Sequence, residues 1–311
     1  MDSLPMNNLL EFNKDTLQTI RKDYNLDKPG SMDQAIDILH EWVQKQNHFE
    51  IKDYPRKYLE RRIIASKGSV ERAKSKIDKN CTLRTLMPQF YKLIDFKTEY
   101  QYSDVLWDGL LPNMTDDYYR IYLLKNVGKR FDDDMMNYFR WLVATVEYMT
   151  AHDYCRGIII VLDYLETNLV ELLKVLEFVK FRQFITLLTD GYGMRIKAFH
   201  VITPSKTVEV LVALFKQVLS AKLGQRIQIH KDLESLHKVV QKDVLPVELG
   251  GNERSIVKLH EEWIALFSSK EFQEYYGKMK AATVNEKYRQ TDKLNEEYMG
   301  IAGTFKTLNV D

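Results

Sequence analysis

The chain has 311 residues, 45% of them hydrophobic, so it is long and apolar enough for one large globular domain or two ordinary ones. Its 45 Lys and Arg residues balance 44 Asp and Glu residues, and the net charge of +1 does not predict nucleic-acid binding. The two cysteines, Cys81 and Cys155, are too few for a disulfide framework and favour the cytoplasm. We expect neither a signal peptide nor a transmembrane helix, because no apolar stretch approaches about 20 residues.

Residues 1–95 are predicted to form an N-terminal helical module. Apolar residues recur there at helical spacing, as at Leu17, Ile20 and Tyr24, and a further helix is expected to begin at Ser69. The loop-rich segment that follows, 97–118, is predicted to connect this module to a second domain.

The apolar period changes after residue 118, where short apolar strands alternate with helices. The strands are expected at 121–127, 158–163, 195–202 and 227–230. Asp132, Asp133 and Asp134 are predicted to cap and begin the helix after the first strand. This order predicts an α/β domain over 96–275 with a small, mostly parallel sheet flanked by helices. The mixed, charged residues 276–311 are predicted to form a C-terminal tail.

The segment 208–219 is apolar almost all round, with only Glu209, Lys216 and Gln217 clearly polar. A helix with this composition is normally buried or contacts an apolar ligand, and this one is too short to span a bilayer. On the residues alone two interpretations stay open. The segment is either an ordinary core helix, or a movable helix that covers an apolar cavity and touches a membrane.

The stretch 191–251 resembles the CRAL-TRIO lipid-transfer family. The match runs through Arg195, Lys197 and His200 on a strand, and through the LPxExGG pattern that begins at Leu245 and ends at Gly251. The resemblance extends over about residues 55–275. It implies the CRAL-TRIO lipid-binding fold, in which the apolar segment 208–219 is a mobile gate helix over a lipid pocket.

The resemblance also implies which side chains form the wall of the pocket, although the same residues would serve equally well as an ordinary filled core. The implied lipid-binding residues are Trp141, Ala144, Thr145, Tyr148, Ile158, Ile160, Leu162, Leu176, Phe184, Leu187, Leu188, Tyr192, Met194, Ile196, Phe199, Val201, Val208, Val212, Phe215 and Leu219.

The gate helix divides into two faces at 100° per residue. Val208, Val212, Phe215 and Leu219 share the face assigned to the ligand. The adjacent face, assigned to the membrane, carries Leu211, Leu214 and Val218. Four bases match family positions that hold phosphoinositide head groups, namely Arg195, Lys197, Lys222 and Arg226. Taken without the resemblance, these bases are equally typical of solvated surface charge.

Sequence motifs of common enzymes are absent. Gly191 and Gly193 lack the third glycine of a dinucleotide fingerprint, and a strand rather than a helix follows them. The P-loop, GxSxG and HExxH patterns are missing, and the histidines and cysteines show no metal-ligand spacing. The pair His152 and Asp153 specifies no catalytic geometry.

We therefore predict a non-enzymatic cytoplasmic monomer that binds a hydrophobic ligand and transfers it between membranes. The ligand is expected to be a tocopherol, retinoid, carotenoid or phospholipid, with no further cofactor and no metal. We expect transient docking on an anionic, phosphoinositide-containing membrane surface. We expect no nucleic acid among its partners. Two alternatives remain: a phosphoinositide-responsive membrane adaptor without bulk transfer, and an α/β nucleotide enzyme.

Overall fold

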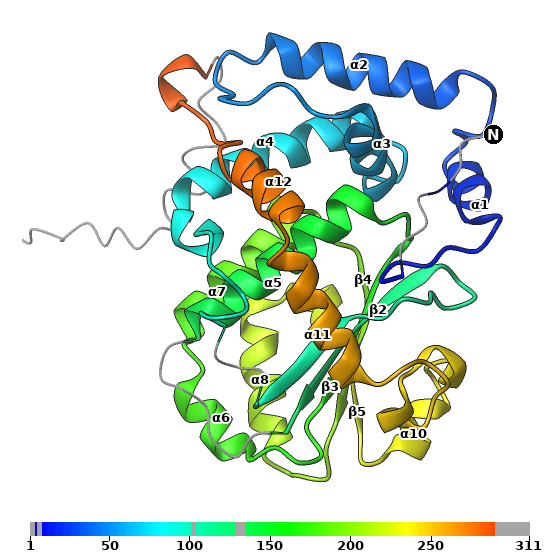
Figure 1. Ribbon diagram of the computed structural model, residues 1–311, viewed down its shortest axis with the longest axis vertical. Coiled ribbons are helices and arrows are strands. Elements are labelled where there is room, and N and C mark those ends of the chain that lie inside the picture. The colour runs from blue at the N-terminus through cyan, green and yellow to red at the C-terminus, as the bar shows by residue number, and fades with distance from the viewer. Residues whose placement is uncertain (1–3, 5–7, 101–103, 128–134, 290–311) are drawn as a thin grey trace, which may run out of the picture.

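The computed structural model describes residues 4, 8–100, 104–127 and 135–289 (Figure 1). The predicted capping residues Asp132, Asp133 and Asp134 lie outside these ranges.

The N-terminal module is helical, as predicted. It contains α1 (Thr16–Asp23), α2 (Ser31–Lys45), α3 (Arg56–Ala65) and α4 (Val70–Leu86), followed by the 3₁₀ turn η1 (Pro88–Tyr91). The hydroxyl of Ser69 accepts a hydrogen bond from the backbone N–H of Arg72 at 3.3 Å, which caps α4 where the sequence predicted a helix start. Apolar side chains from all four helices, including Ile20, Leu39 and Leu59, form a second core cluster, to which Ala151 and Met279 also belong.

The part of the chain that follows is built on one five-stranded sheet with the order β1-β2-β3-β4-β5. Its strands are β1 (Leu106–Leu110), β2 (Tyr119–Asn126), β3 (Gly157–Asp163), β4 (Ile196–Ile202) and β5 (Ile227–His230). Strands β2 to β5 are parallel and correspond to the four predicted strands. The antiparallel edge strand β1 lies in the segment that we predicted to be a loop-rich connector. The prediction missed it because Asp108 and Gly109, at its centre, are residues that strands disfavour.

The crossover helices cover one face of this sheet. They are α5 (Met136–His152), α6 (Leu169–Val175), α7 (Phe178–Thr186) with the π-helical turn η2 (Leu187–Gly191), and α8 (Val208–Val218) with α9 (Ala221–Gly224). Because the parallel strands follow one another in order and such crossovers are right-handed, all these helices must pack on the same side. Figure 1 shows α5, α6, α7 and α8 together on one side of the strands and α10 (Leu233–His237) on the other.

The C-terminal part of the chain contacts both the sheet and the N-terminal helices. After the short turns η3 (Lys242–Val244) and η4 (Val247–Leu249), the chain forms α11 (Ile256–Phe267), α12 (Lys270–Lys280) and η5 (Glu286–Tyr288). Trp263 of α11 donates its indole N–H to the carbonyl of Leu110 at 3.1 Å, which fastens α11 to the sheet edge.

The segment predicted as a tail from residue 276 onward is in part an ordered element. Helix α12 continues to Lys280, and Val284 pairs with Phe49 as an isolated antiparallel bridge. The backbone N–H of Asn285 donates to the carbonyl of His48 at 2.7 Å. We call residues 281–289 the C-terminal strap, because they hold the N-terminal module through contacts far away in sequence; residues 290–311 lie outside the described ranges.

A buried histidine pair joins β4 to β5 and predicts an acid-sensitive fold. Nδ1 of His200 lies 2.9 Å from Nε2 of His230, and both side chains are buried. Burial, with the adjacent His230, lowers the pKa of His200 from 6.5 to about 4. Because the pKa of such a histidine is lower in the folded protein, the unfolded chain takes up the proton first as the pH falls. The contribution of the histidine to stability is therefore complete above its unfolded pKa and is lost as the pH falls toward its folded pKa.

We expect the free energy of unfolding to fall by about 2–3 kcal/mol between pH 6.5 and pH 4 on account of His200. Urea denaturation at a series of pH values measures this change, and His200→Gln should flatten the profile relative to His40→Gln. Equal pH slopes in the two variants would show that the His200 pair is not the acid-sensitive element.

Candidate functional site

A cavity of about 140 Å³ lies between the sheet and its helices α5 to α8. The strands supply Leu106, Leu110, Tyr122, Leu124, Asn126, Ile158, Ile160, Leu162 and Phe199. The helices and their flanking residues supply Met135, Tyr138, Phe139, Leu142, Thr145, Val146, Met149, Tyr164, Leu172, Leu176, Phe181, Phe184, Ile185, Leu188, Leu211, Phe215 and Leu219. No Lys, Arg, His, Asp or Glu lines this cavity in the described part of the chain. Such a lining suits an apolar molecule and offers no counter-ion to a charged one.

Helix α5 has two buried faces, and one of them lines the cavity. Residues three and four apart along the helix form the cavity face, from Tyr138 through Leu142 to Thr145. The other face packs on the C-terminal helices: the ring of Trp141 lies 5.0 Å from that of Phe267, and the ring of Tyr148 lies 5.3 Å from that of Trp263. The aromatic contacts with α11 therefore determine which face of α5 is left for the cavity.

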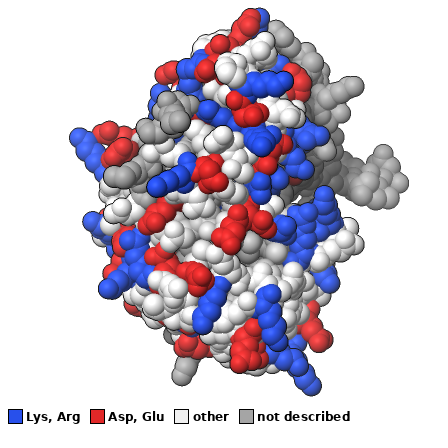
Figure 2. Space-filling view, turned by 90° about the vertical axis from the view of Figure 1, so that its right-hand side faces the viewer, with Lys and Arg blue, Asp and Glu red and all other residues white. Residues whose placement is uncertain are grey.

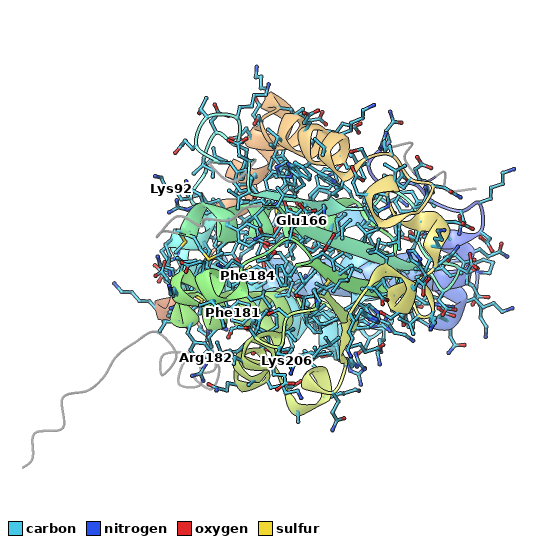
Figure 3. The ribbon with its side chains drawn as sticks, turned by 90° about the horizontal axis from the view of Figure 1, so that it is seen from below. Lys92, Glu166, Phe181, Arg182, Phe184 and Lys206 are labelled. Atoms are coloured by element: carbon cyan, nitrogen blue, oxygen red, sulfur yellow. The ribbon has the colours of Figure 1, made fainter. Side chains whose placement is uncertain are left out.

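Helix α8 closes the cavity with one face and exposes the other to solvent. The buried face includes Leu211 and Phe215, and the ring of Phe215 stacks on that of Phe181 in α7 at 4.9 Å. Phe181 and Phe184, which α7 contributes to the wall, are labelled in Figure 3. The outer face carries Val210, whose exposed fraction is 53%, together with exposed Glu209, Ala213, Lys216 and Gln217.

The four predicted phosphoinositide-binding bases lie at the amino-terminal ends of β4 and β5. Lys197 and Lys222 are exposed, and the ammonium group of Lys197 lies 5.1 Å from the centre of the Tyr119 ring. Arg195 and Arg226 are half-buried; their guanidinium groups donate to the Tyr24 hydroxyl and the Ile196 carbonyl. The topology of the sheet thus brings all four to one edge, although the two arginines also hold the fold together. Acidic and basic side chains are mixed over the face shown in Figure 2.

Residues 110–251 match the family model described as the CRAL/TRIO domain. This part of the chain is similar to the CRAL/TRIO domain. Its relatives include "Alpha-tocopherol transfer protein-like" of Mus musculus, 30% identical over 117 residues that make up 37% of this chain and 34% of the relative. The Homo sapiens protein of the same name is 34% identical over 96 residues, which are 30% of this chain and 28% of the relative. The match therefore spans about a third of these relatives' own length.

A solved structure entitled "Crystal structure of Sfh5" has a similar arrangement, with a TM-score of 0.48, 12% sequence identity, and coverage of 85% of this chain and 100% of that chain.

Half of the predicted lipid-binding residues line the cavity between the sheet and α5 to α8. These are Thr145, Ile158, Ile160, Leu162, Leu176, Phe184, Leu188, Phe199, Phe215 and Leu219. The cavity is not lined by Trp141, Ala144, Tyr148, Leu187, Tyr192, Met194, Ile196, Val201, Val208 or Val212. The difference arises because several of these elements are buried on more than one side, so an apolar residue need not face the cavity. The hydroxyl of Tyr192, for example, donates to buried Glu147 at 2.8 Å.

The predicted membrane face of α8 requires one correction. Leu211 was assigned to the membrane, but its exposed fraction is 1% and it lines the cavity. Leu211 lies four residues before Phe215, so the two share one helical face. Leu214 and Val218 are half-buried, and Val210, which the sequence did not single out, is the most exposed large apolar residue of this helix.

Sequence reasoning also missed the β2 side of the wall. Tyr122, Leu124 and Asn126 alternate along β2, and the first two pair in register with Ile160 and Leu162 of β3. The period of two along a strand could have identified them once β2 was placed beside β3.

The described residues contain no cluster of His, Cys, Asp and Glu that could hold a metal ion. Across the same residues, every helix is too short or too polar to cross a membrane.

Proposed function

We propose that this chain binds one hydrophobic small molecule in its CRAL/TRIO cavity and carries it between membranes. The observation that supports this most is the cavity itself, which is lined by uncharged side chains and closed by α8. Removing a long apolar molecule from water is favourable by roughly 25 cal/mol per Å² of buried surface, so binding needs no catalytic group. We propose a tocopherol, retinoid, carotenoid or phospholipid as the ligand, and no enzymatic activity.

The size of the cavity supports a role for α8 as a gate. A cavity of about 150 Å³ holds a molecule as small as benzene, and this one measures about 140 Å³. A lipid with a long chain needs more room than that. The stacked rings of Phe181 and Phe215 lie where α7 meets α8, so separation of these two helices would enlarge the cavity.

The exterior of α8 and the nearby bases supply the surface for membrane docking in this proposal. Val210 and half-buried Leu214 would enter the interfacial region of the bilayer. Lys197 and Lys222, both exposed, would be attracted to anionic lipid, including phosphoinositides.

Mass spectrometry of the lipids extracted from the purified, full-length protein tests the proposal. One hydrophobic small molecule at about equimolar amount is the expected result. Phosphoinositide alone would favour a membrane adaptor that does not transfer lipid, and a nucleotide would favour an enzyme. Absence of any bound lipid, together with failure to take one up from vesicles, would contradict lipid transfer.

Replacing Lys222 and Arg226 by Ala should weaken binding to phosphoinositide-containing vesicles by about thirtyfold, because each base near an anionic surface contributes about 1 kcal/mol. Vesicle co-sedimentation at low salt measures the change, and high salt should remove most of the difference. Since Arg226 also donates to the Ile196 carbonyl, Lys197→Ala with Lys222→Ala is the matched pair that spares this contact. Unchanged vesicle binding by both double variants would exclude this edge as the docking site.

A further inference from the structure

A second hollow lies between α1, α3, α12 and the end of α5. Its volume is about 450 Å³, which falls within the range of about 300–1,000 Å³ that is typical of small-molecule sites. Aromatic and aliphatic side chains form most of its wall, among them Tyr58 of α3, Tyr154 after α5 and Tyr275 of α12. We call this hollow the α3 pocket; it shares no lining residue with the cavity between the sheet and α5 to α8.

Buried carboxylates hold two of these tyrosines in place. The hydroxyl of Tyr154 donates to Oε2 of Glu60 at 3.0 Å, and the hydroxyl of Tyr275 donates to Oε1 of Glu147 at 2.8 Å. Both carboxylates belong to buried residues, so the two bonds are shielded from water. The aromatic part of the wall is therefore fixed before a ligand arrives, which lowers the entropic cost of binding.

Arg61 of α3 brings a positive charge to the wall without an anionic partner. No hydrogen bond or ion pair joins its guanidinium group to a residue that the structure describes, and its Nε atom is buried. The group lies over the ring of Tyr154, 4.6 Å from the ring centre. Asp153, next to Tyr154 in the chain, already pairs with Arg120 at 2.9 Å. A buried donor of this kind normally has an acceptor, so the geometry calls for one from outside the described chain.

The other acids at this wall are also paired with bases. Glu60 accepts from Lys57 at 3.1 Å, and Glu147 pairs with Arg84 at 2.9 Å. No Asp or Glu lines the α3 pocket within the described ranges, whereas Lys57 and Arg61, four residues apart on one face of α3, both do. The electrostatic character of the pocket therefore suits an anion, and Arg61 supplies the charge that an anion would meet.

His152 adds a neutral group that can form a hydrogen bond. It lines the pocket at the end of α5, and its ring packs on those of Tyr148 at 4.3 Å and Tyr275 at 5.9 Å. Burial, with the charge of Arg61, lowers the pKa of His152 from 6.5 to about 4, so the imidazole is neutral at physiological pH. A neutral imidazole has one N–H to donate and adds no charge to the site.

We propose that the α3 pocket binds a small amphipathic carboxylate, whose anionic group pairs with Arg61 and whose apolar part contacts the aromatic wall. One guanidinium group without a partner matches a single negative charge, whereas a doubly charged phosphate would keep an uncompensated charge against apolar side chains. None of the four predicted phosphoinositide-binding bases lines this pocket. The inference is thus independent of the proposed lipid transfer.

The test compares acids with alcohols on the same apolar skeleton. Phenylacetate with phenylethanol, and octanoate with octanol, are titrated calorimetrically into the full-length protein at neutral pH. We expect each acid to bind about ten- to hundredfold more tightly than its alcohol, the effect of one charge-assisted hydrogen bond. Arg61→Gln should remove this preference. Arg182→Gln changes an exposed arginine of α7, labelled in Figure 3, and is the matched control.

The pKa of His152 gives a second measurement that does not depend on an arginine variant. Because a nearby anion favours the charged imidazole, a saturating acid should raise the pKa of His152 above its value of about 4. The corresponding alcohol should leave this pKa unchanged. A pH titration followed by NMR measures it, and His152→Gln identifies the resonance.

Several outcomes would overturn the inference. These are failure of both acids to bind, equal affinities of acid and alcohol, and equal affinities of Arg61→Gln and Arg182→Gln for the acid. Inorganic phosphate that bound as tightly as the acids would show that the apolar wall contributes nothing. If Arg61→Gln weakened only the binding of phosphoinositide vesicles, Arg61 would belong to the docking edge instead. Should a thermal melt show that Arg61→Gln does not fold, an unmoved pKa of His152 in the unaltered protein would itself contradict the proposal.

Discussion

Phe215→Ala should release bound ligand at least tenfold faster in the absence of vesicles, while the protein still docks on them. Phe215 lines the cavity and stacks on Phe181 at 4.9 Å, so the change removes both a wall and a contact between α7 and α8. Truncation of a buried Phe lowers the free energy of unfolding by about 3–5 kcal/mol, and part of this loss comes from the cavity that the missing ring leaves. The ligand off-rate and the fraction of protein on vesicles, measured on one preparation, check the prediction.

Val210→Ser with Leu214→Ser is the matched variant on the other side of α8. These side chains lie on or near the outer face, so the double variant should slow transfer between vesicles about tenfold and leave the solution off-rate unchanged. Leu211 is unsuitable for this purpose because it lines the cavity. If both variants altered off-rate and docking in equal proportion, α8 would act as a single core element, and the adaptor function would become the better proposal.

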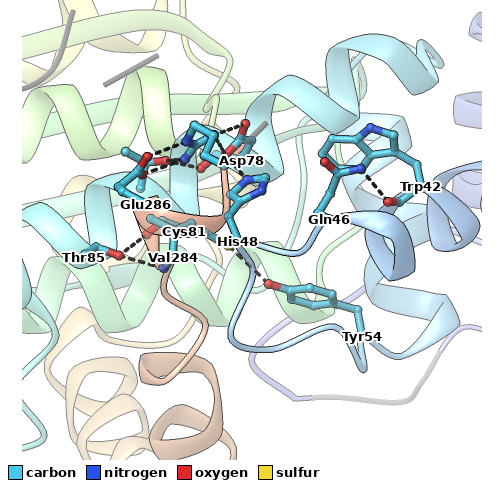
Figure 4. A network of polar contacts seen from close by, with 11 residues as sticks. Trp42, Gln46, His48, Tyr54, Asp78, Cys81, Thr85, Val284 and Glu286 are labelled. Atoms are coloured by element: carbon cyan, nitrogen blue, oxygen red, sulfur yellow. Dashed lines mark hydrogen bonds and ion pairs between the residues drawn. The ribbon is translucent and has the colours of Figure 1, made fainter. Parts of the chain in front are cut away.

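Arg289→Ala should destabilise the protein by about 3–5 kcal/mol, because it leaves a buried carboxylate without its main partner. The guanidinium Nη1 of Arg289 lies 2.7 Å from both carboxylate oxygens of Asp78, and its Nη2 lies 2.8 Å from the Thr82 hydroxyl. His48 Nε2 approaches Asp78 at 3.1 Å, and Figure 4 shows this network between α4 and the C-terminal strap. We expect the strap to detach from the N-terminal module.

Chemical denaturation measures the change, and Arg56→Ala is the control. Arg56 pairs with Asp33 and Asp37 on the surface, where such pairs contribute roughly 0–1 kcal/mol.

The network also predicts a pH dependence of stability. Burial works to raise the pKa of Asp78, but hydrogen bonds from His48 and Arg289 hold that pKa below its ordinary value. The stabilisation is therefore present above the unfolded pKa of Asp and is lost as the pH falls through the folded value. Equal stability of the two variants, or an unchanged acid profile, would contradict this account of the strap.

Local patterns in the sequence determined the order of the main elements and, together with the family resemblance, predicted one side of the cavity. A strand has two faces, so the alternation of Ile158, Ile160 and Leu162 predicts their common direction as soon as the strand is recognised. The apolar segment 208–219 and the family pattern that ends at Gly251 likewise marked α8 and the end of the matched region. These features depend on neighbours within a few residues along the chain.

The tertiary structure alone decided which faces of the buried helices meet the cavity. Trp141 and Tyr138 are both aromatic members of α5, and the difference between them arises because α11 packs on Trp141. The same holds for Asp108, whose partners Tyr122, Trp141 and His260 lie 14, 33 and 152 residues away. A helix that is apolar all round carries no periodic signal, and a buried polar group is defined by partners that only the folded chain brings together.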